Sequence, residues 1–156
     1  MENFCKKNGL EEAKDQNTLK RKYSEETIKK IYSNKSTSHG LTYEIKKLKN
    51  NEKIQLMLEV TSNLYWGFCF IDTNGEYSKN LYNIEEELNK LGFKKDKWWW
   101  KYLYDEKNNE IKLKELDSEL ACIIMDDEKL KKLVINLVDR IRADYDKIAN
   151  ELEKID

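Results

Sequence analysis

Hydrophobic and polar residues begin to alternate with a period of two near residue 41. The alternation runs over residues 41–46 and again over 54–60, and residues 49–52 between them form a polar turn. This pattern predicts a β-hairpin with one buried face. Residues 64–71 are apolar at nearly every position, as in a central or covered strand, and turn-forming residues 72–75 follow. The sequence therefore predicts a three-stranded antiparallel meander.

Helical spacing follows the predicted sheet. Apolar residues repeat every three or four positions from residue 81 to 91, and Gly92 stands where a left-handed helix C-cap is expected. Residues 116–124 suggest a short helix, and Asp126 and Asp127 open a long amphipathic one. The apolar stripe of this last helix contains Leu130, Leu133, Val134, Leu137, Ile141, Tyr145, Ile148, Leu152 and Ile155. We expect its stripe to pack on the domain and its far end to overhang, where it could pair with another helix in a homodimer.

The first 36 residues are loosely apolar and predict a helical N-terminal lead. Residues 24–27 resemble a helix N-terminus, and a polar linker follows over residues 33–40. The predicted fold class is therefore α+β, a small antiparallel meander sheet packed against helices with a long C-terminal helix. The predicted organisation is a lead over residues 1–36 and a single domain over residues 37–156.

Composition limits the classes of partner. The 156 residues are 38% charged, but the formal net charge is −1, so the chain as a whole lacks the basic footprint of a nucleic-acid-binding protein. Any electrostatic partner must meet a local patch. Cys5, Cys69 and Cys122 are widely spaced without a CxxC pair, which favours a reducing, cytoplasmic location over a zinc site. No secretion signal or membrane span is expected.

The stretch KKDKWWWKYLY over residues 94–104 holds three of the four tryptophans. In an extended chain, residues 98, 100, 102 and 104 share one face, and residues 99, 101 and 103 share the other. The simplest interpretation packs Trp98, Trp100 and Tyr102 beneath a helix, with Trp99 lying flat under lysine stems. A second interpretation makes the stretch a protein-binding surface of Lys97, Trp99, Lys101 and Tyr104. A third makes it a nucleic-acid site of Lys94, Lys95, Lys97, Trp99 and Lys101.

Catalytic chemistry has little support in the sequence. His39 is the only histidine, and no Ser/His/Asp or Cys/His arrangement or glycine-rich phosphate loop is evident, so no catalytic residue or cofactor is predicted. Glu44 and Lys46 have an E-x-K spacing that puts both side chains on one face of a strand, with Glu59 on the neighbouring strand. These three residues form the alternative of a metal-dependent nuclease centre. Charged pairs on the polar face of an ordinary strand explain them equally well.

The words KIQLMLEV, NLYWGFCFID, LGFKKDKWWWKYL and LVDRIRADYDKI occur in this order along the chain. This order resembles the C-terminal, non-catalytic region that follows the core of some prokaryotic PD-(D/E)XK nuclease superfamily proteins, over about three quarters of the chain. Residues 1–40 are too short to hold the nuclease core that would precede it. The resemblance therefore implies an accessory or recognition module without catalytic residues.

Two functional hypotheses follow. The first is a non-enzymatic protein-interaction module that binds a protein partner, for which a nuclease or nucleoprotein complex is one candidate. In its narrower form the chain is a small inhibitor of a host defence nuclease, encoded by a mobile element as an antiviral-defence counter-measure. The alternative is a nucleic-acid-binding accessory module or a residual metal-dependent nuclease.

Overall fold

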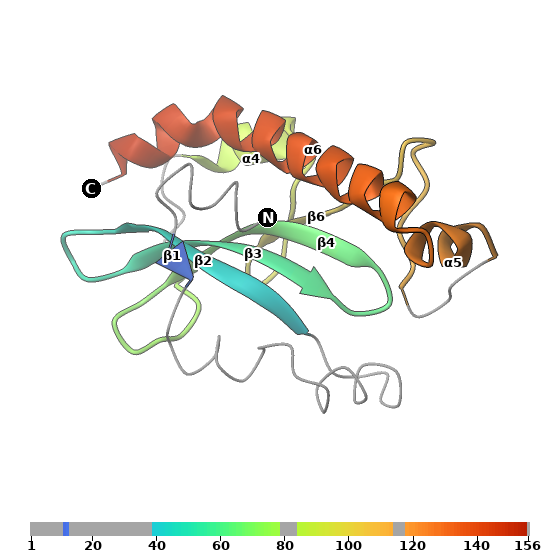
Figure 1. Ribbon diagram of the computed structural model, residues 1–156. Coiled ribbons are helices and arrows are strands. Elements are labelled where there is room, and N and C mark those ends of the chain that lie inside the picture. The colour runs from blue at the N-terminus through green and yellow to red at the C-terminus, as the bar shows by residue number, and fades with distance from the viewer. Residues whose placement is uncertain (1–10, 13–38, 79–83, 114–117, 156) are drawn as a thin grey trace.

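The computed structural model describes residues 11–12, 39–78, 84–113 and 118–155 (Figure 1). Within these residues, six strands form one antiparallel sheet in the order β1-β2-β3-β4-β6-β5. The strands are β1 (Glu11–Glu12), β2 (His39–Lys47), β3 (Lys53–Val60), β4 (Leu64–Ile71), β5 (Lys94–Lys95) and β6 (Trp99–Tyr102). The helices are α4 (Glu85–Lys90), α5 (Ser118–Ile124) and α6 (Asp127–Lys154). The predicted α+β class is confirmed.

The predicted meander corresponds to β2, β3 and β4. The turn between β2 and β3 contains Asn51 with a φ of 65°, and the turn after β4 contains Gly75 with a φ of 82°. Asp72 Oδ1 closes that second turn by accepting from the backbone N–H groups of Asn74 and Glu76 at 2.8 and 2.9 Å. The turn residues of the sequence therefore fix where these strands end.

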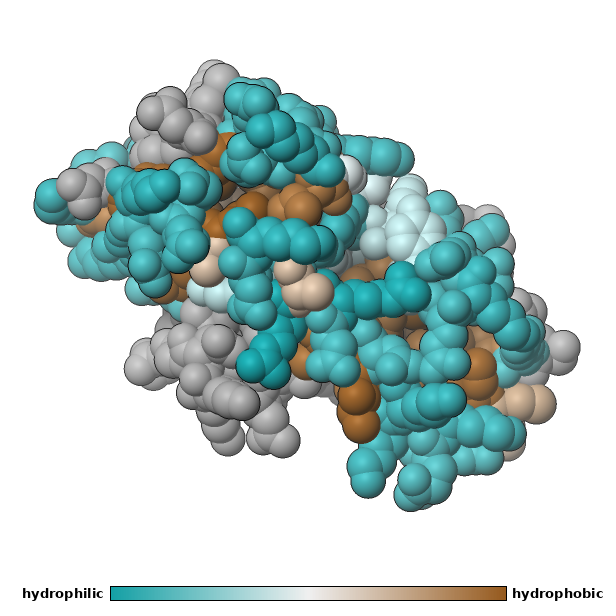
Figure 2. Space-filling model, turned by 90° about the horizontal axis from the view of Figure 1, so that it is seen from above, coloured by the Kyte–Doolittle hydropathy of each residue, from teal (hydrophilic) through white to brown (hydrophobic). Residues whose placement is uncertain are grey.

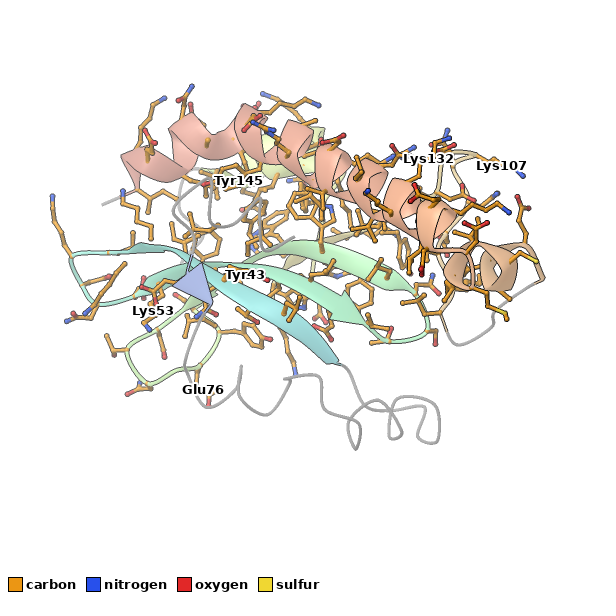
Figure 3. All side chains as sticks on the ribbon, in the orientation of Figure 1. Tyr43, Lys53, Glu76, Lys107, Lys132 and Tyr145 are labelled. Atoms are coloured by element: carbon orange, nitrogen blue, oxygen red, sulfur yellow. The ribbon has the colours of Figure 1, made fainter. Side chains whose placement is uncertain are left out.

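The hydrophobic core lies between the sheet and α6, which crosses one face of it (Figure 1). Trp66 and Phe68 of β4 are fully buried there, and Phe93 after α4 packs edge-on against Trp66 with ring centroids 5.2 Å apart. Tyr145 of α6 points toward the sheet (Figure 3) and stacks on Phe68 with ring centroids 6.4 Å apart. Burial at this interface raises the pKa of the Tyr145 hydroxyl.

The opposite face of the sheet is not a plain solvated surface, which corrects the prediction of a hairpin with one buried face. Gln55 and Glu59 of β3 are 3% and 5% exposed, although both point away from α6. Glu59 Oε1 accepts from the Tyr65 hydroxyl at 3.3 Å, and Gln55 Oε1 accepts from Cys69 Sγ at 3.7 Å. Gln55 and Glu59 are thus both hydrogen-bonded to side chains of the neighbouring strand β4.

The two ends of α6 are the reverse of the expectation. Its C-terminal part is buried, with Ile148 and Leu152 at 1% and 2% exposure. Lys46 Nζ donates to the carbonyl oxygens of Glu153 and Ile155 at 2.7 and 2.6 Å, which anchors this end to β2. The N-terminal part, together with α5, extends beyond the strands (Figure 1). The first residue of α6 in the hydrophobic core or packed against it is Leu133, so only the first turns of the helix overhang.

Part of the N-terminal lead belongs to the sheet. Glu11 and Glu12 pair with Glu44 and Tyr43 as the short strand β1, where the sequence predicted helix. The rest of the lead, residues 1–10 and 13–36, and most of the linker lie outside the described residues. The division at residues 36 and 37 therefore stays a prediction. His39 is the first residue of β2 and pairs with Val60, so the strand begins inside the predicted linker.

Asp126 caps α6 and makes its stability depend on pH. Asp126 Oδ1 accepts from the backbone N–H groups of Glu128 and Lys129 at 3.1 and 3.0 Å. The N–H of Lys129, above all, holds the pKa of this carboxyl below its ordinary value. A lowered folded-state pKa means that the cap stabilises the fold above the unfolded-state pKa. That stabilisation is lost as pH falls through the folded-state value.

We expect Asp126→Asn to keep the melting temperature near pH 7, because asparagine caps helices about as well as aspartate. Below about pH 4 the melting temperature of this variant should fall less steeply than that of the wild type. Asp126→Ala should melt lower at pH 7, because it loses both hydrogen bonds. Thermal denaturation followed by circular dichroism from pH 2 to 8 checks this, and parallel curves for wild type and Asp126→Asn would contradict it.

Candidate functional site

The tryptophan stretch forms β6 at one side of the sheet and splits its side chains between two faces. Trp99 and Lys101 stand opposite Phe68 and Trp66 of β4, on the face covered by α6. Trp100 and Tyr102 stand opposite Gly67 and Tyr65, on the face turned away from α6. The register with β4 therefore decides which part of the stretch is core and which is surface.

The surface part is a cluster of aromatic rings, which we call the outer aromatic cluster. Its members are the half-buried side chains Tyr65, Trp98, Trp100, Tyr102 and Tyr104. The Tyr65 ring lies at the centre, 5.8 Å from Trp98, 5.6 Å from Trp100 and 6.3 Å from Tyr102, measured between ring centroids. Tyr104 extends the cluster from Tyr102 at 6.5 Å. Tilted and edge-on contacts hold these rings in fixed orientations.

Lysines of β5 and the following turn border the outer aromatic cluster. Lys94 Nζ lies 5.2 Å from the centroid of the Trp100 ring and 5.3 Å from that of Tyr102, within the range of a cation–π contact. Lys97 is exposed in the turn between β5 and β6. Lys95 points to the other face, where it lies 3.6 Å from Glu85 and 5.2 Å from the Trp99 ring. Lys94 thus lies against the cluster, and Lys97 directly precedes Trp98 in the chain.

The second and third interpretations of the stretch placed Trp99 on a binding surface, and that placement is wrong. Its side chain is 3% exposed and belongs to the hydrophobic core. The interpretation that buried Trp98, Trp100 and Tyr102 beneath a helix is also wrong. These three rings lie on the sheet face turned away from α6. The alternation along the stretch was predicted correctly, but the assignment of its two faces was inverted.

Lys101 likewise faces the interior layer rather than a partner. Its ammonium group forms an ion pair with Asp144 of α6, and the Lys101 and Asp144 side chains are 21% and 16% exposed. Lys101 Nζ also donates to the carbonyl oxygen of Leu91 at 3.1 Å and lies 4.8 Å from the Phe93 ring centroid. Lys101 therefore connects β6 to α6 and to the end of α4. Of the expected protein-binding residues, Lys97 and Tyr104 remain at the surface, and Trp99 and Lys101 do not form that surface.

The alternative metal centre is not assembled. A β-bulge between Glu44 and Lys46 shifts the register, so that Glu44 pairs with Gln55 and Lys46 with Ile54. These two partners point to opposite faces of β3, and hence so do Glu44 and Lys46. Glu44 forms an ion pair with Lys53 at 2.9 Å, and Glu59 interacts with Tyr65. The expectation that Glu44 and Lys46 share a face is therefore wrong.

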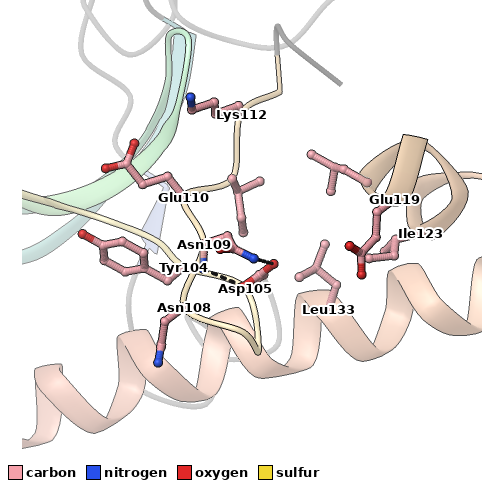
Figure 4. A pocket seen from close by; sticks show the side chains of 11 residues that line it. Tyr104, Asp105, Asn108, Asn109, Glu110, Lys112, Glu119, Ile123 and Leu133 are labelled. Carbon is pink, nitrogen blue, oxygen red and sulfur yellow. Dashed lines mark hydrogen bonds between the residues drawn. The ribbon is translucent and has the colours of Figure 1, made fainter. Parts of the chain in front are cut away.

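A polar pocket of about 660 Å³ lies between the turn at residues 105–109, α5 and the start of α6 (Figure 4). Its carboxylates have structural partners. Asp105 Oδ1 accepts from the backbone N–H groups of Lys107 and Asn109, each at 2.8 Å, and Glu119 forms an ion pair with Lys107. Among the described residues, no group of three or more His, Cys, Asp or Glu side chains is placed to hold a metal ion. The pocket thus offers no assembled acid–base or metal chemistry.

Comparison of the chain with protein-family models, with curated proteins and with solved structures finds no match. The resemblance to the accessory region of PD-(D/E)XK nucleases thus stays a hypothesis. In the part of the chain that the structure describes, no helix is long and apolar enough to cross a bilayer. The outer aromatic cluster is the candidate functional site on its geometry alone.

Sequence reasoning missed most of this cluster. Tyr104, Lys94 and Lys97 were among the candidate residues, whereas Tyr65, Trp98, Trp100 and Tyr102 were not assigned to a site. The signal that could have found them is Gly67, the one position without a side chain in the otherwise bulky run of residues 64–71. A glycine in a strand often marks a place where another backbone approaches closely, here that of β6.

Proposed function

We propose that this chain is a non-enzymatic protein-binding module that contacts its partner through the outer aromatic cluster. The observation that carries the proposal is the position of the rings, at the surface of the sheet face opposite α6, while the core has its own set of aromatic residues. Tryptophan and tyrosine supply much of the energy of protein interfaces because their large, rigid rings lose little entropy on binding. Lys94 and Lys97 would form part of a polar rim around them.

The narrower hypothesis that the partner is a nuclease, and that this chain inhibits it, is supported by the resemblance described above. A recognition module without a nuclease core can occupy the position that the module normally takes in the complete enzyme. In that case the chain competes for a surface rather than performing chemistry. The proposal of protein binding does not depend on this narrower form.

The double variant Trp98→Ala/Trp100→Ala should remain folded and bind its partner at least about 30-fold more weakly, the loss expected for two hot-spot residues. The tagged wild-type chain should capture a stoichiometric partner from lysate of the source cells, and the variant should not. Met125→Ala is the matched control, since it removes an apolar side chain that is 87% exposed and lies outside the cluster. Far-UV circular dichroism checks that all three chains are folded. Equal capture of the partner by the wild type and both variants would refute the proposed surface.

The second candidate function, single-stranded nucleic-acid binding, is favoured by one observation. The Lys94 ammonium group lies 5.2 Å from the half-buried Trp100 ring, and exposed Lys97 directly precedes half-buried Trp98 in the chain. Such a combination of rings and lysines can stack bases and contact phosphates. The same double variant separates the two functions. If a fluorescent oligonucleotide binds the wild type with an affinity that falls steeply with salt, and does not bind the variant, nucleic-acid binding replaces the protein-binding proposal.

For the narrower hypothesis, captured partner that cleaves DNA should lose that activity when excess wild-type chain is added. The double variant should leave the cleavage unchanged, because it does not compete. Cleavage that continues at saturating wild-type chain would exclude inhibition while leaving the proposal of protein binding intact.

A further inference from the structure

On the side of α6 that points away from the sheet, five side chains form a row along the helix, which we call the α6 outer stripe. Its members are Glu128, Lys131, Ile135, Asp139 and Arg142, all of them exposed. With about 100° of rotation per residue, all five lie within about 40° of the direction of Ile135. The core-facing residues Leu137, Ile141, Ile148 and Leu152 lie on the other side of the helix.

The centre of the α6 outer stripe is apolar. Ile135 is 51% exposed and its neighbour Val134 is 43% exposed, although both belong to residue types usually buried. Figure 2 looks down on this side of the molecule, which is largely hydrophilic with hydrophobic areas between the charged side chains. About half of the Ile135 side chain is therefore left uncovered by the rest of the chain.

The charges on either side of Ile135 are arranged with opposite signs at equal distances. Lys131 and Asp139 lie four residues before and after Ile135, and Glu128 and Arg142 lie seven residues before and after it. Within the described residues, neither Lys131 nor Asp139 forms an ion pair. The only intramolecular ion pair of Arg142 in that part of the chain is a long contact to Asp146 at 3.9 Å.

We propose that two copies of this chain associate through antiparallel packing of α6 against α6, with the two-fold axis at Ile135. An axis there places Lys131 opposite the partner's Asp139 and Glu128 opposite the partner's Arg142. Each pair occurs twice by symmetry, because a two-fold interface is formed by the same patch on both copies. A parallel arrangement in the same register would place like charges together, so the charge pattern selects the antiparallel one.

The dimer should be weak and dependent on concentration. The α6 outer stripe runs over about 21 Å from residue 128 to residue 142, at 1.5 Å per residue. One helix pair of that length buries less area than the roughly 1,600 Å² of a standard stable interface. The apolar centre supplies most of the attraction, and exposed ion pairs mainly fix the orientation.

Charge exchange at one pair tests the arrangement. Sedimentation equilibrium of the full chain between about 10 and 500 µM should show a monomer–dimer equilibrium. Lys131→Asp places two carboxylates opposite each other twice and should weaken the dimer about tenfold. The exchanged variant Lys131→Asp/Asp139→Lys restores opposite charges in the dimer and should return the association constant to near the wild-type value.

Ile135→Lys is the third variant. It places two ammonium groups at the two-fold axis and should give a monomer at every concentration. All three substituted positions, 131, 135 and 139, are exposed, and unchanged thermal melting of a dilute sample confirms that each variant is folded. A wild-type chain that stays monomeric at 500 µM overturns the proposal. So does an exchanged variant as weak as Lys131→Asp alone, or a dimer that survives Ile135→Lys.

Discussion

Replacing Trp99 with alanine is expected to lower the free energy of unfolding by about 3–5 kcal/mol, the range for removing a large aromatic side chain from a core. The Trp99 side chain is 3% exposed and lies on the α6 side of β6, opposite Phe68. Little of the space it leaves can be filled by collapse, because residues 65–68 of β4, opposite this part of β6, are paired with strands on both sides. Urea unfolding followed by far-UV circular dichroism measures the change without relying on tryptophan fluorescence.

Trp98→Ala is the matched control, since it removes the same side chain one position earlier. Trp98 is half-buried at the edge of the outer aromatic cluster, so its loss should cost about 1 kcal/mol or less. Equal losses of stability in the two variants would contradict the assignment of faces. The comparison also shows why the partner-capture experiment replaces Trp98 and Trp100 and leaves Trp99 unchanged. If Trp99→Ala lost partner binding, the cause would be unfolding rather than a lost contact.

The order and type of most elements could be predicted from local patterns. The strand at residues 64–71 has the bounds expected from its apolar run, and the turns at Asn51 and Gly75 occur where turn-forming residues stand. The C-cap at Gly92 is also confirmed, with a φ of 79° and its N–H donating to the carbonyl of Asn89 at 2.9 Å. Such features depend on a few consecutive residues, so one sequence suffices to find them.

The faces of the strands could not be predicted, because they depend on pairing between distant segments. The alternation of residues 98–104 has two solutions that differ by turning the strand over. Only the register with β4, which sets Trp99 opposite Phe68, selects one of them. The bulge between Glu44 and Lys46 could not be predicted for the same reason. It exists because Glu44 and Lys46 pair with the adjacent residues Gln55 and Ile54 of β3, a pairing that local sequence does not determine.

The unpredictable strand faces led to more errors in the candidate site than in the fold. A binding surface is defined by which side chains point outward, so an inverted face replaces Trp100 and Tyr102 with Trp99 and Lys101. Lys101 illustrates the physical reason. Its long stem can cross the apolar Phe93 ring while its charge reaches Asp144, so a lysine among aromatic residues does not by itself indicate an exposed position.

The two proposed surfaces lie on opposite sides of the molecule and can be tested separately. The outer aromatic cluster belongs to the sheet face turned away from α6, and the α6 outer stripe belongs to the side of α6 turned away from the sheet. A dimer through α6 would leave both aromatic clusters accessible. Such a dimer would bind a repeated or dimeric partner with higher apparent affinity than a single domain, without any new contact at the cluster.

Gly67→Ala is expected to lower the free energy of unfolding by about 3 kcal/mol, the upper part of the range for an overpacked core. A Cβ at this position would overlap the carbonyl oxygen of Trp99 and lie 2.7 Å from its carbonyl carbon and 2.8 Å from Trp100 Cα. These are backbone atoms of β6 that cannot move aside as a flexible side chain could. The strand would have to separate from β4, which exposes Trp99 and divides the outer aromatic cluster between Tyr65 and the rings of β6.

Gly75→Ala distinguishes this steric effect from the general cost of replacing glycine. A Cβ at Gly75 meets no atom within 4 Å, but the φ of 82° disfavours alanine, so a loss of about 1 kcal/mol is expected. Gly67→Ala should additionally change the near-UV circular dichroism of the tryptophans and lose partner binding, whereas Gly75→Ala should keep both. If Gly67→Ala unfolds no more easily than Gly75→Ala, β6 does not approach β4 as closely as the structure has it. The assembly of the outer aromatic cluster from these two strands would then fail with it.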